Sequence, residues 1–364
     1  MRKIVVVAFL ILAVAILGIL QFKKPQETGG AEKITKIGVL LDGARADRSY
    51  CQSHCESLES LRDEFNLEIV YREYVSADCY PDIVSLIRDE GCQMIVGVSV
   101  RFGRDMERAA GMFPEVYFLH AGGRGQHSNF SSFYGRMYQA RYLLGIVAGA
   151  QTKTGEIGYV ASEPIPEVIR GINAFTLGAR SVHPDAVVHV RYAKSATDDA
   201  AAGSACAELL NQYPIDVMGA QTSSLAPHME AERRGIWSVG CNLDNALAYP
   251  KTYLSACVWN WDPYYRKQIR DCLRGGFYGS HVWLDMADGI AAISPLTSNA
   301  DARALEEVQA ANEKLRSRAF DVFYGPVRDN AGHIRVGAGE TMPDRELLDS
   351  FYWYVEGVTT VEGL

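Results

Sequence analysis

The feature that most constrains this chain is an alternation of short apolar runs with amphipathic segments, which occurs twice along its 364 residues. The clearest unit spans residues 156–180, where the apolar run 157–161 has the composition of a buried strand. A turn with two prolines follows, and apolar residues then recur at helical spacing through residues 166–180. In an open α/β sheet such a turn lies at the carboxyl edge, where ligands bind. The unit therefore predicts one wall of a cleft, and the alternative is a strand and helix that only pack.

The same pattern organises the rest of the chain. Before residue 156, we predict strands at 34–42, 67–75, 93–99, 115–119 and 133–137, with helices at 47–65, 81–90, 102–112 and 139–150. After it, strands are predicted at 187–193, 216–220, 237–242 and 252–259, with helices at 198–213, 225–234 and 263–274. Residues 282–293 are expected to be extended and 302–317 helical, with late strands at 320–323 and 334–336.

This alternation predicts an α/β protein of two doubly wound parallel-sheet lobes, joined by a hinge, with a cleft at the strand carboxyl ends. The length agrees with two lobes that each bury a core. We expect residues 34–138 with about 260–318 in the first lobe, and 139–259 with about 319–364 in the second. Gly145 and Gly149 are expected to permit close helix packing. The net charge of -8 provides no basic footprint for nucleic acid.

The N-terminus has the pattern of an export signal. Arg2 and Lys3 precede an unbroken apolar run at residues 4–20, and a polar tether follows at 26–33. No cysteine follows the run, so a lipid anchor is not expected, and a cut near residue 15 would leave apolar residues exposed. We therefore expect residues 1–25 to act as an uncleaved membrane anchor, with a cleaved signal as the alternative. The body then lies in the periplasm or at the outer face of the cytoplasmic membrane.

Motifs for catalysis, dinucleotide binding or metal binding are absent from the sequence. Cys51, His54 and Cys55 are closely spaced, but no CxxC pair accompanies them, so disulfides or buried thiols are favoured over zinc among the eight cysteines. We therefore expect no cofactor and no metal. A nucleoside hydrolase that uses Asp42, Asp47 or Asp244 remains an alternative, although no positioned acid–base pair supports it.

Aromatic and small polar residues gather where the predicted strands end. Stacking faces together with amides and carboxylates suit a planar heterocycle. The candidate ligand-binding residues are Tyr50, Phe102, Glu163, Gln221, Asn242 and Trp259. Each of them has a simpler interpretation; Trp259, for example, suits hinge packing equally well.

The quoted stretches resemble the basic membrane protein family of extracytoplasmic solute-binding proteins, which includes purine nucleoside receptors. The resemblance covers about residues 37–358. It is carried by YxxRYLxGIVAGxxTKTxxIGYVAxxPIPEVIRGINAFTLGARSVxP at 138–184, TYLSACVWNWDPYY at 252–265, ADG at 287–289, FDVFYGP at 320–326 and WYVEG at 353–357. It implies a type I periplasmic-binding-protein fold, a purine base or nucleoside as ligand and delivery of that ligand to an ABC permease. We expect the protein to be a monomer.

The resemblance also implies roles for individual residues. Tyr50 stands where this branch usually has a tryptophan that stacks on the base, and Phe102 and Trp259 match further cleft aromatics. Asn242 replaces a ribose-binding aspartate and Trp259 replaces a lysine, which favours a free base or another heterocycle over a nucleoside. Gln221 stands where the branch usually has an acidic residue. A membrane-anchored sensor with the same fold is the alternative to a transport receptor.

Overall fold

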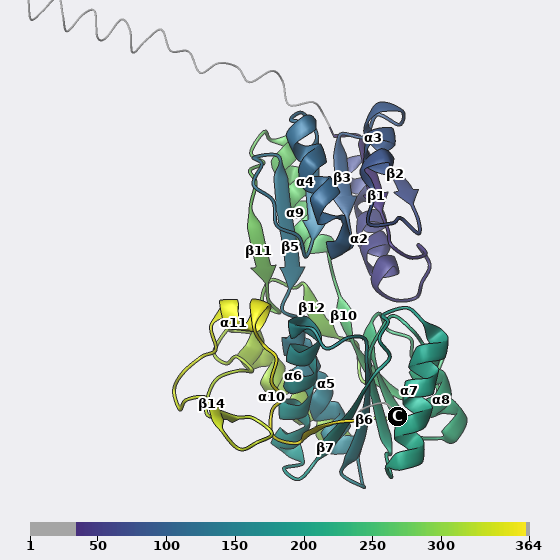
Figure 1. The fold of residues 1–364 in the computed structure, drawn as a ribbon, viewed down its shortest axis with the longest axis vertical. Helices are drawn as coiled ribbons and strands as arrows, with labels where there is room; N and C mark the ends of the chain where they lie inside the picture. Colours follow the sequence, from purple (N-terminus) through teal and green to yellow (C-terminus); the bar gives the residue numbers. More distant parts are fainter. Residues whose placement is uncertain (1–33, 362–364) are drawn as a thin grey trace, which may run out of the picture.

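The computed structural model describes residues 34–361. They form two lobes stacked along the long axis of the molecule, each built around one main sheet (Figure 1). The predicted anchor and tether, residues 1–25 and 26–33, lie outside the described residues. Within residues 34–361, none of the helices is long and apolar enough to cross a membrane.

The first lobe has a six-stranded sheet between two layers of helices. Its strands are β1 (Lys36–Leu40), β2 (Glu68–Arg72), β3 (Met94–Gly97), β4 (Tyr117–Ala121), β5 (Phe130–Gly135) and β11 (His281–Leu284), and its helices are α2 (Tyr50–Phe65), α3 (Tyr80–Arg88), α4 (Gly103–Met112) and α9 (Asp262–Leu273). The order is β11–β5–β4–β3–β1–β2, and all pairs are parallel. Successive side chains of β3 face opposite cores, since Met94 and Val96 belong to one apolar cluster and Ile95 to another. This burial of both faces explains the continuous apolar runs.

The second lobe repeats this arrangement around seven strands. These are β6 (Glu156–Ala161), β7 (Val187–Tyr192), β8 (Val217–Gln221), β9 (Trp237–Asn242), β10 (Tyr253–Trp259), β12 (Ala291–Ile293) and β15 (Val358–Thr360), and the helices are α5 (Met137–Gln151), α6 (Pro166–Val182), α7 (Asp199–Gln212), α8 (Ala226–Arg234), α10 (Ala302–Arg316) and α11 (Asp344–Asp349). The order is β12–β10–β9–β8–β6–β7–β15, and β12 runs antiparallel to β10. The two doubly wound parallel-sheet lobes predicted from the sequence are confirmed.

Helices α5 and α6 approach each other closely because glycines line their contact. A Cβ atom on Gly145 would lie 2.0 Å from the carbonyl oxygen of Phe175, and one on Gly178 would lie 1.9 Å from that of Tyr142. Any side chain at these positions would force the backbones apart. Gly149 meets α6 in the same way, at 2.4 Å from the carbonyl oxygen of Ala179. The predicted close packing at Gly145 and Gly149 is confirmed.

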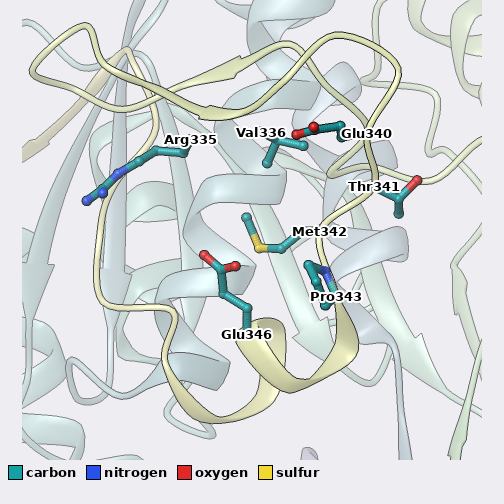
Figure 2. A pocket seen from close by; sticks show the side chains of 7 residues that line it. All are labelled: Arg335, Val336, Glu340, Thr341, Met342, Pro343 and Glu346. Atoms are coloured by element: carbon teal, nitrogen blue, oxygen red, sulfur yellow. The ribbon is translucent and has the colours of Figure 1, made fainter.

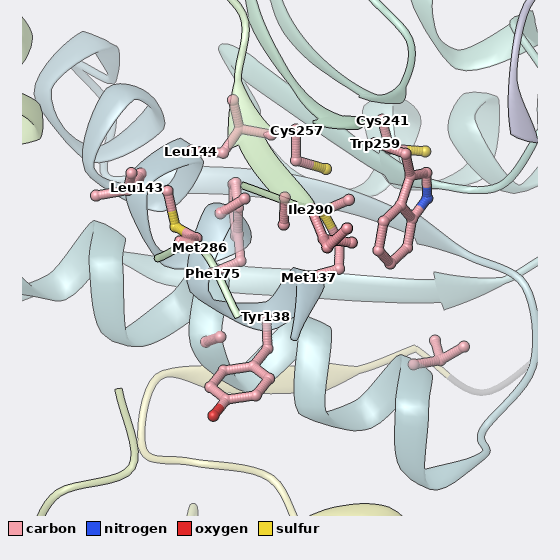
Figure 3. Close-up of a cluster of buried hydrophobic side chains, with 14 of the residues drawn as sticks. Met137, Tyr138, Leu143, Leu144, Phe175, Cys241, Cys257, Trp259, Met286 and Ile290 are labelled. Atoms are coloured by element: carbon pink, nitrogen blue, oxygen red, sulfur yellow. The ribbon is translucent and has the colours of Figure 1, made fainter. Parts of the chain in front are cut away.

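Apolar side chains from these helices and from β9 and β10 form a core that extends to the junction between the lobes. Figure 3 shows Leu144, Phe175 and Cys257 in this core, with Trp259 at one end. Trp259 therefore belongs to the core of the second lobe and at the same time ends the strand that leads to the first.

The chain crosses between the lobes after β5, after β10 and between β11 and β12. The last crossing departs from the predicted lobe boundaries. Residues 291–316 were expected in the first lobe, but β12 pairs with β10 and α10 packs against α5. The single extended segment predicted at 282–293 is instead two strands in different sheets. Charged and polar residues between them, such as Asp285 and Asp288, form a turn held by Arg318 at 2.7 and 2.9 Å.

The C-terminal segment packs along the second lobe beside α6 (Figure 1). Asn173 of α6 holds it through both atoms of its amide, since it donates to the Trp353 carbonyl at 2.8 Å and accepts from the Val355 N–H at 3.0 Å. β13 (Val327–Arg328) and β14 (Ile334–Val336) form a small hairpin. The strand predicted at 320–323 is wrong: these residues form a turn, and their large side chains instead fill the core.

Candidate ligand-binding site

Asn242 connects the two lobes at the carboxyl end of β9. Its amide nitrogen donates to the Ser49 hydroxyl of the first lobe at 2.9 Å, and its amide oxygen accepts from the Trp259 indole N–H at 3.1 Å. Its φ of 69° lies in the left-handed region, which asparagine tolerates better than most residues do. A second bond runs beside it, from the Asn245 amide to the Arg48 carbonyl at 3.2 Å. The predicted residue Asn242 therefore lies where the lobes meet.

Trp259 forms the centre of an aromatic group at the same junction. Its ring stacks on Trp261 with centroids 4.4 Å apart and planes 18° apart, and Trp261 in turn stacks on His54 at 4.4 Å. The edge of Tyr50 meets both tryptophans at 6.3 Å. Gly135 makes room for Trp259, because a Cβ there would lie 2.4 Å from the indole ring. Tyr50 and Trp259, predicted from separate halves of the chain, are thus brought together.

Tyr50 is the first residue of α2 and is held there by the loop before it. The Asp47 carboxylate accepts hydrogen bonds from the backbone N–H groups of Ser49, Cys51 and Gln52 at 2.8–3.0 Å, which satisfies the open helix end. The Tyr50 ring is half-buried. Burial raises the pKa of its hydroxyl well above the usual value, so the group stays protonated at neutral pH.

Gln221 is the last residue of β8, and its buried side chain ends a series of two linked hydrogen bonds. The Arg141 guanidinium donates to the Tyr159 hydroxyl at 3.1 Å, and that hydroxyl donates to the Gln221 amide oxygen at 3.2 Å. Burial raises the pKa of the neighbouring Cys241 thiol to about 11, so this thiol is neutral. The predicted residue Gln221 therefore lies at the expected edge of the sheet, at the end of a chain of donors.

A further contact between the lobes was not predicted. The Tyr134 hydroxyl at the end of β5 donates to the Glu167 carboxylate in the first turn of α6 at 2.6 Å. Burial, together with the Glu167 charge, raises the pKa of Tyr134 well above its usual value. The aromatic–Gly–Arg sequence that ends β5 and the acid after Pro166 were the available signals. Arg141 and Tyr159 were not predicted as site residues, because Arg141 lies on α5 and Tyr159 on β6 and their hydrogen bond forms only when this helix packs on the sheet.

Two predicted residues do not lie at the junction. Phe102 is fully buried in the core beneath α3 and α4, with Leu40, Ile95 and Met106, because a short 3-10 turn at Val100–Phe102 rotates its ring inward. Glu163 is exposed in the turn after β6, where its carbonyl accepts from the Ile165 N–H at 2.9 Å. Its neighbour one helical turn later, Glu167, makes the interlobe contact instead.

Two hollows lie elsewhere on the surface. One of about 450 Å³ is lined by residues of the C-terminal segment, and Figure 2 shows Arg335, Met342 and Glu346 around it. The other, of about 480 Å³, lies between the segment after β12 and α10. Neither is lined by any of the six predicted residues. Both belong to one lobe only, so closure of the lobes would not act on them, and the junction remains the better candidate site.

Comparison with known proteins agrees with this architecture. Residues 34–320 match the family model described as ABC transporter substrate-binding protein PnrA-like. The chain belongs to this PnrA-like substrate-binding family. The description of the family names substrate-binding proteins of ABC transporters, which accords with two lobes that meet at the strand ends.

Two proteins of similar sequence and one solved structure extend the comparison. A purine-binding protein of Brucella abortus is 31% identical over 334 residues, which cover 90% of this chain and 94% of the relative. A protein of Haloferax volcanii, named as a candidate ABC transporter glucose-binding protein, is 28% identical and covers 86% of this chain and 77% of its own length. An ABC transporter solute-binding protein of Conexibacter woesei superposes with a TM-score of 0.68 at 18% identity, over 79% of this chain and 98% of that one. This structural likeness confirms the predicted fold.

The acids considered for hydrolysis have structural partners in this PnrA-like protein. Asp47 caps α2, Asp42 pairs with Arg101 at 3.3 Å, and Asp244 accepts from the Ala246 N–H at 3.0 Å. All eight cysteines are buried free thiols. His54 faces the Tyr265 hydroxyl at 2.7 Å rather than the neighbouring cysteines, and within residues 34–361 no group of three His, Cys, Asp or Glu could hold a metal ion.

Proposed function

We propose that this PnrA-like protein binds a purine base, or a closely related planar heterocycle, between its lobes and closes on it. The observation that carries the proposal is the group at the junction: Tyr50 from one lobe and Trp259 from the other, with Asn242 hydrogen-bonded to both sides. Aromatic faces provide stacking area, and the amide provides a donor and an acceptor for a heterocycle edge. The name of the Brucella abortus relative supports the same ligand class.

Closure gives the mechanism a physical basis. The bonds Asn242–Ser49 and Tyr134–Glu167 join residues of different lobes, so they exist only when the lobes are together. A ligand that contacts both lobes stabilises this closed state by its differential affinity for it. We propose that Tyr50 and Trp259 flank the ring while Gln221 and Asn242 read its polar edges. The resemblance to purine nucleoside receptors favours a free base over a nucleoside. Trp259 stands where those receptors have a lysine, and Asn242 stands where they have a ribose-binding aspartate.

The family assignment supports a proposal for the cellular setting. We propose that the closed receptor delivers its ligand to the permease subunits of an ABC importer, as a monomer at the outer face of the cytoplasmic membrane. Residues 1–25 would serve as its anchor, which the apolar run at 4–20 supports. We propose no catalytic role and no nucleic-acid partner, since the candidate acids have structural partners and the net charge is -8.

A thermal-shift screen tests the proposed ligand. The panel contains adenine, hypoxanthine, guanine, their nucleosides, pyrimidines, flavins and glucose. A ligand at one hundred times its Kd stabilises the folded protein by about 2.7 kcal/mol, which gives a measurable rise in Tm. We expect a shift with at least one purine base and a smaller one with its nucleoside. A shift with glucose alone would refute the proposed ligand and leave the family assignment intact.

A further inference from the structure

Arg141 is a buried cation without an acidic partner. Only 5% of its surface is exposed, and among residues 34–361 no carboxylate oxygen lies within 4.0 Å of its guanidinium. A buried charge is costly unless it is paired or fully hydrogen-bonded. The guanidinium has five N–H donors, and one hydrogen bond within the described residues uses Nη1, to the Tyr159 hydroxyl. Arg141 therefore has donors to spare beside the lobe junction.

The hydrogen bonds that start at Arg141 all run in one direction. Arg141 donates to Tyr159, Tyr159 donates to the Gln221 amide oxygen, and the Gln221 amide nitrogen then remains as the free end of the chain. Bonds aligned in this way polarise one another. The edge of the second lobe at Gln221 consequently offers N–H donors to a ligand.

The local geometry depends on Gly171 of α6. A Cβ at this position would lie 2.4 Å from the Gln221 amide oxygen and 3.0 Å from Arg141 Nε. These two groups therefore occupy the space above the glycine, and even a methyl group would displace them. Gly171 lies inside α6 and has no left-handed backbone, so the need for glycine here is steric rather than conformational.

The charges around the hydrogen bonds that link Arg141, Tyr159 and Gln221 also favour a ligand that presents a hydrogen-bond acceptor. Arg141 of α5 and Arg170 of α6 are both buried, and the negative charge of Glu167 favours the protonated form of each guanidinium. Glu167 is already hydrogen-bonded to Tyr134, and Arg170 donates to the Leu347 carbonyl. Arg141 and Arg170 together carry two positive charges, and Glu167 carries one negative charge, so these three residues have a net positive charge.

We infer that Arg141, acting through Tyr159 and Gln221, makes the site select purines with a carbonyl acceptor, such as hypoxanthine or xanthine, over adenine. The inference rests on the proposed purine function and names the ligand class of that same site. Adenine would present its exocyclic amino group, a donor, to the Gln221 donors, whereas a 6-oxopurine presents an acceptor there. Arg141 and Tyr159 are positioning residues, and Gln221 is the residue that meets the ligand.

Calorimetric titration of hypoxanthine, xanthine and adenine into the wild type and three variants tests this. The readout is the ratio of adenine Kd to hypoxanthine Kd, which a purely structural defect would not change. We expect the ratio to exceed about 10 in the wild type, since mismatched buried polar groups discriminate strongly. Gln221→Glu replaces the donor by an acceptor and should lower the ratio at least tenfold. Arg141→Met and Gly171→Ala should lower it as well.

Arg233→Met is the matched control, because Arg233 lies on the surface of α8 and should leave the ratio unchanged. If Arg141→Met fails to fold, Gln221→Glu and Gly171→Ala still decide the question. A wild type that prefers adenine, or a ratio that Gln221→Glu leaves unchanged, would overturn this inference while purine binding stands. A wild type that binds no purine at all would overturn both the inference and the proposed function.

Discussion

The interlobe hydrogen bond between Asn242 and Ser49 offers the sharpest test of closure. Its 2.9 Å contact joins β9 of one lobe to the loop before α2 of the other, so it forms only when the lobes are together. A hydrogen bond of this kind contributes about 0.5–1.5 kcal/mol net. Ser49→Ala removes this bond and leaves the Trp259 contact in place. We expect its ligand Kd to rise by about twofold to tenfold, with little change in the stability of the separate lobes.

Asn242→Gly completes a double-mutant cycle with Ser49→Ala. Glycine is chosen because φ at this position is 69°, where alanine would add backbone strain of about 1–2 kcal/mol. The variant also loses the acceptor for the Trp259 indole, so its Kd should rise further than that of Ser49→Ala. In the double variant the two effects should fall short of additivity by about 0.5–1.5 kcal/mol. Calorimetry on all four proteins gives this coupling, and fully additive effects would refute a closure-specific bond.

Three further predictions follow from the placement of single side chains. Tyr50→Ala should weaken ligand binding about tenfold by removing a stacking face, whereas Tyr74→Ala, at a residue that is 74% exposed, should not; equal Kd values would remove Tyr50 from the site. Phe102→Ala should lower the free energy of unfolding by about 3–5 kcal/mol in urea titrations, and a loss of affinity without this loss of stability would contradict its core position. Burial lowers the pKa of His228 from 6.5 to about 4, so the unfolded chain binds its proton first and stability falls as the pH drops from 6.5 toward 4. His228→Leu should flatten part of that decline, and an unchanged pH profile would count against it.

The order of apolar and amphipathic segments was sufficient to predict the buried strands, the turns that follow them and the two-lobed fold. Strands buried on both faces are continuous apolar runs, and the turns that follow them meet at one edge of each sheet. That rule alone predicted that Tyr50, Gln221 and Asn242, from three distant segments, would lie at strand ends. Tyr50 and Asn242 lie at the lobe junction, and Gln221 lies at the carboxyl end of β8. Gly145 was also predictable, because a glycine within an apolar helix indicates a close neighbour.

The errors come from choices that depend on rotation or on distant partners. Phe102 follows a strand as predicted, but one 3-10 turn directs its ring into the core. Glu163 and Glu167 are four residues apart, and only the helical turn decides which of them reaches Tyr134. β12 changes sheets because its partner is β10, a pairing that no local signal encodes. The chain from Arg141 to Gln221 likewise exists only in the folded molecule.

Small-angle X-ray scattering of the purified protein tests the central claim of ligand-driven closure most directly. Profiles are recorded without ligand, with a saturating purine base chosen from the thermal-shift screen, and with glucose. The account predicts that the purine base reduces the radius of gyration, that glucose does not, and that Ser49→Ala requires more purine for the same contraction. A purine that binds without any contraction, or a contraction produced by glucose alone, would contradict it.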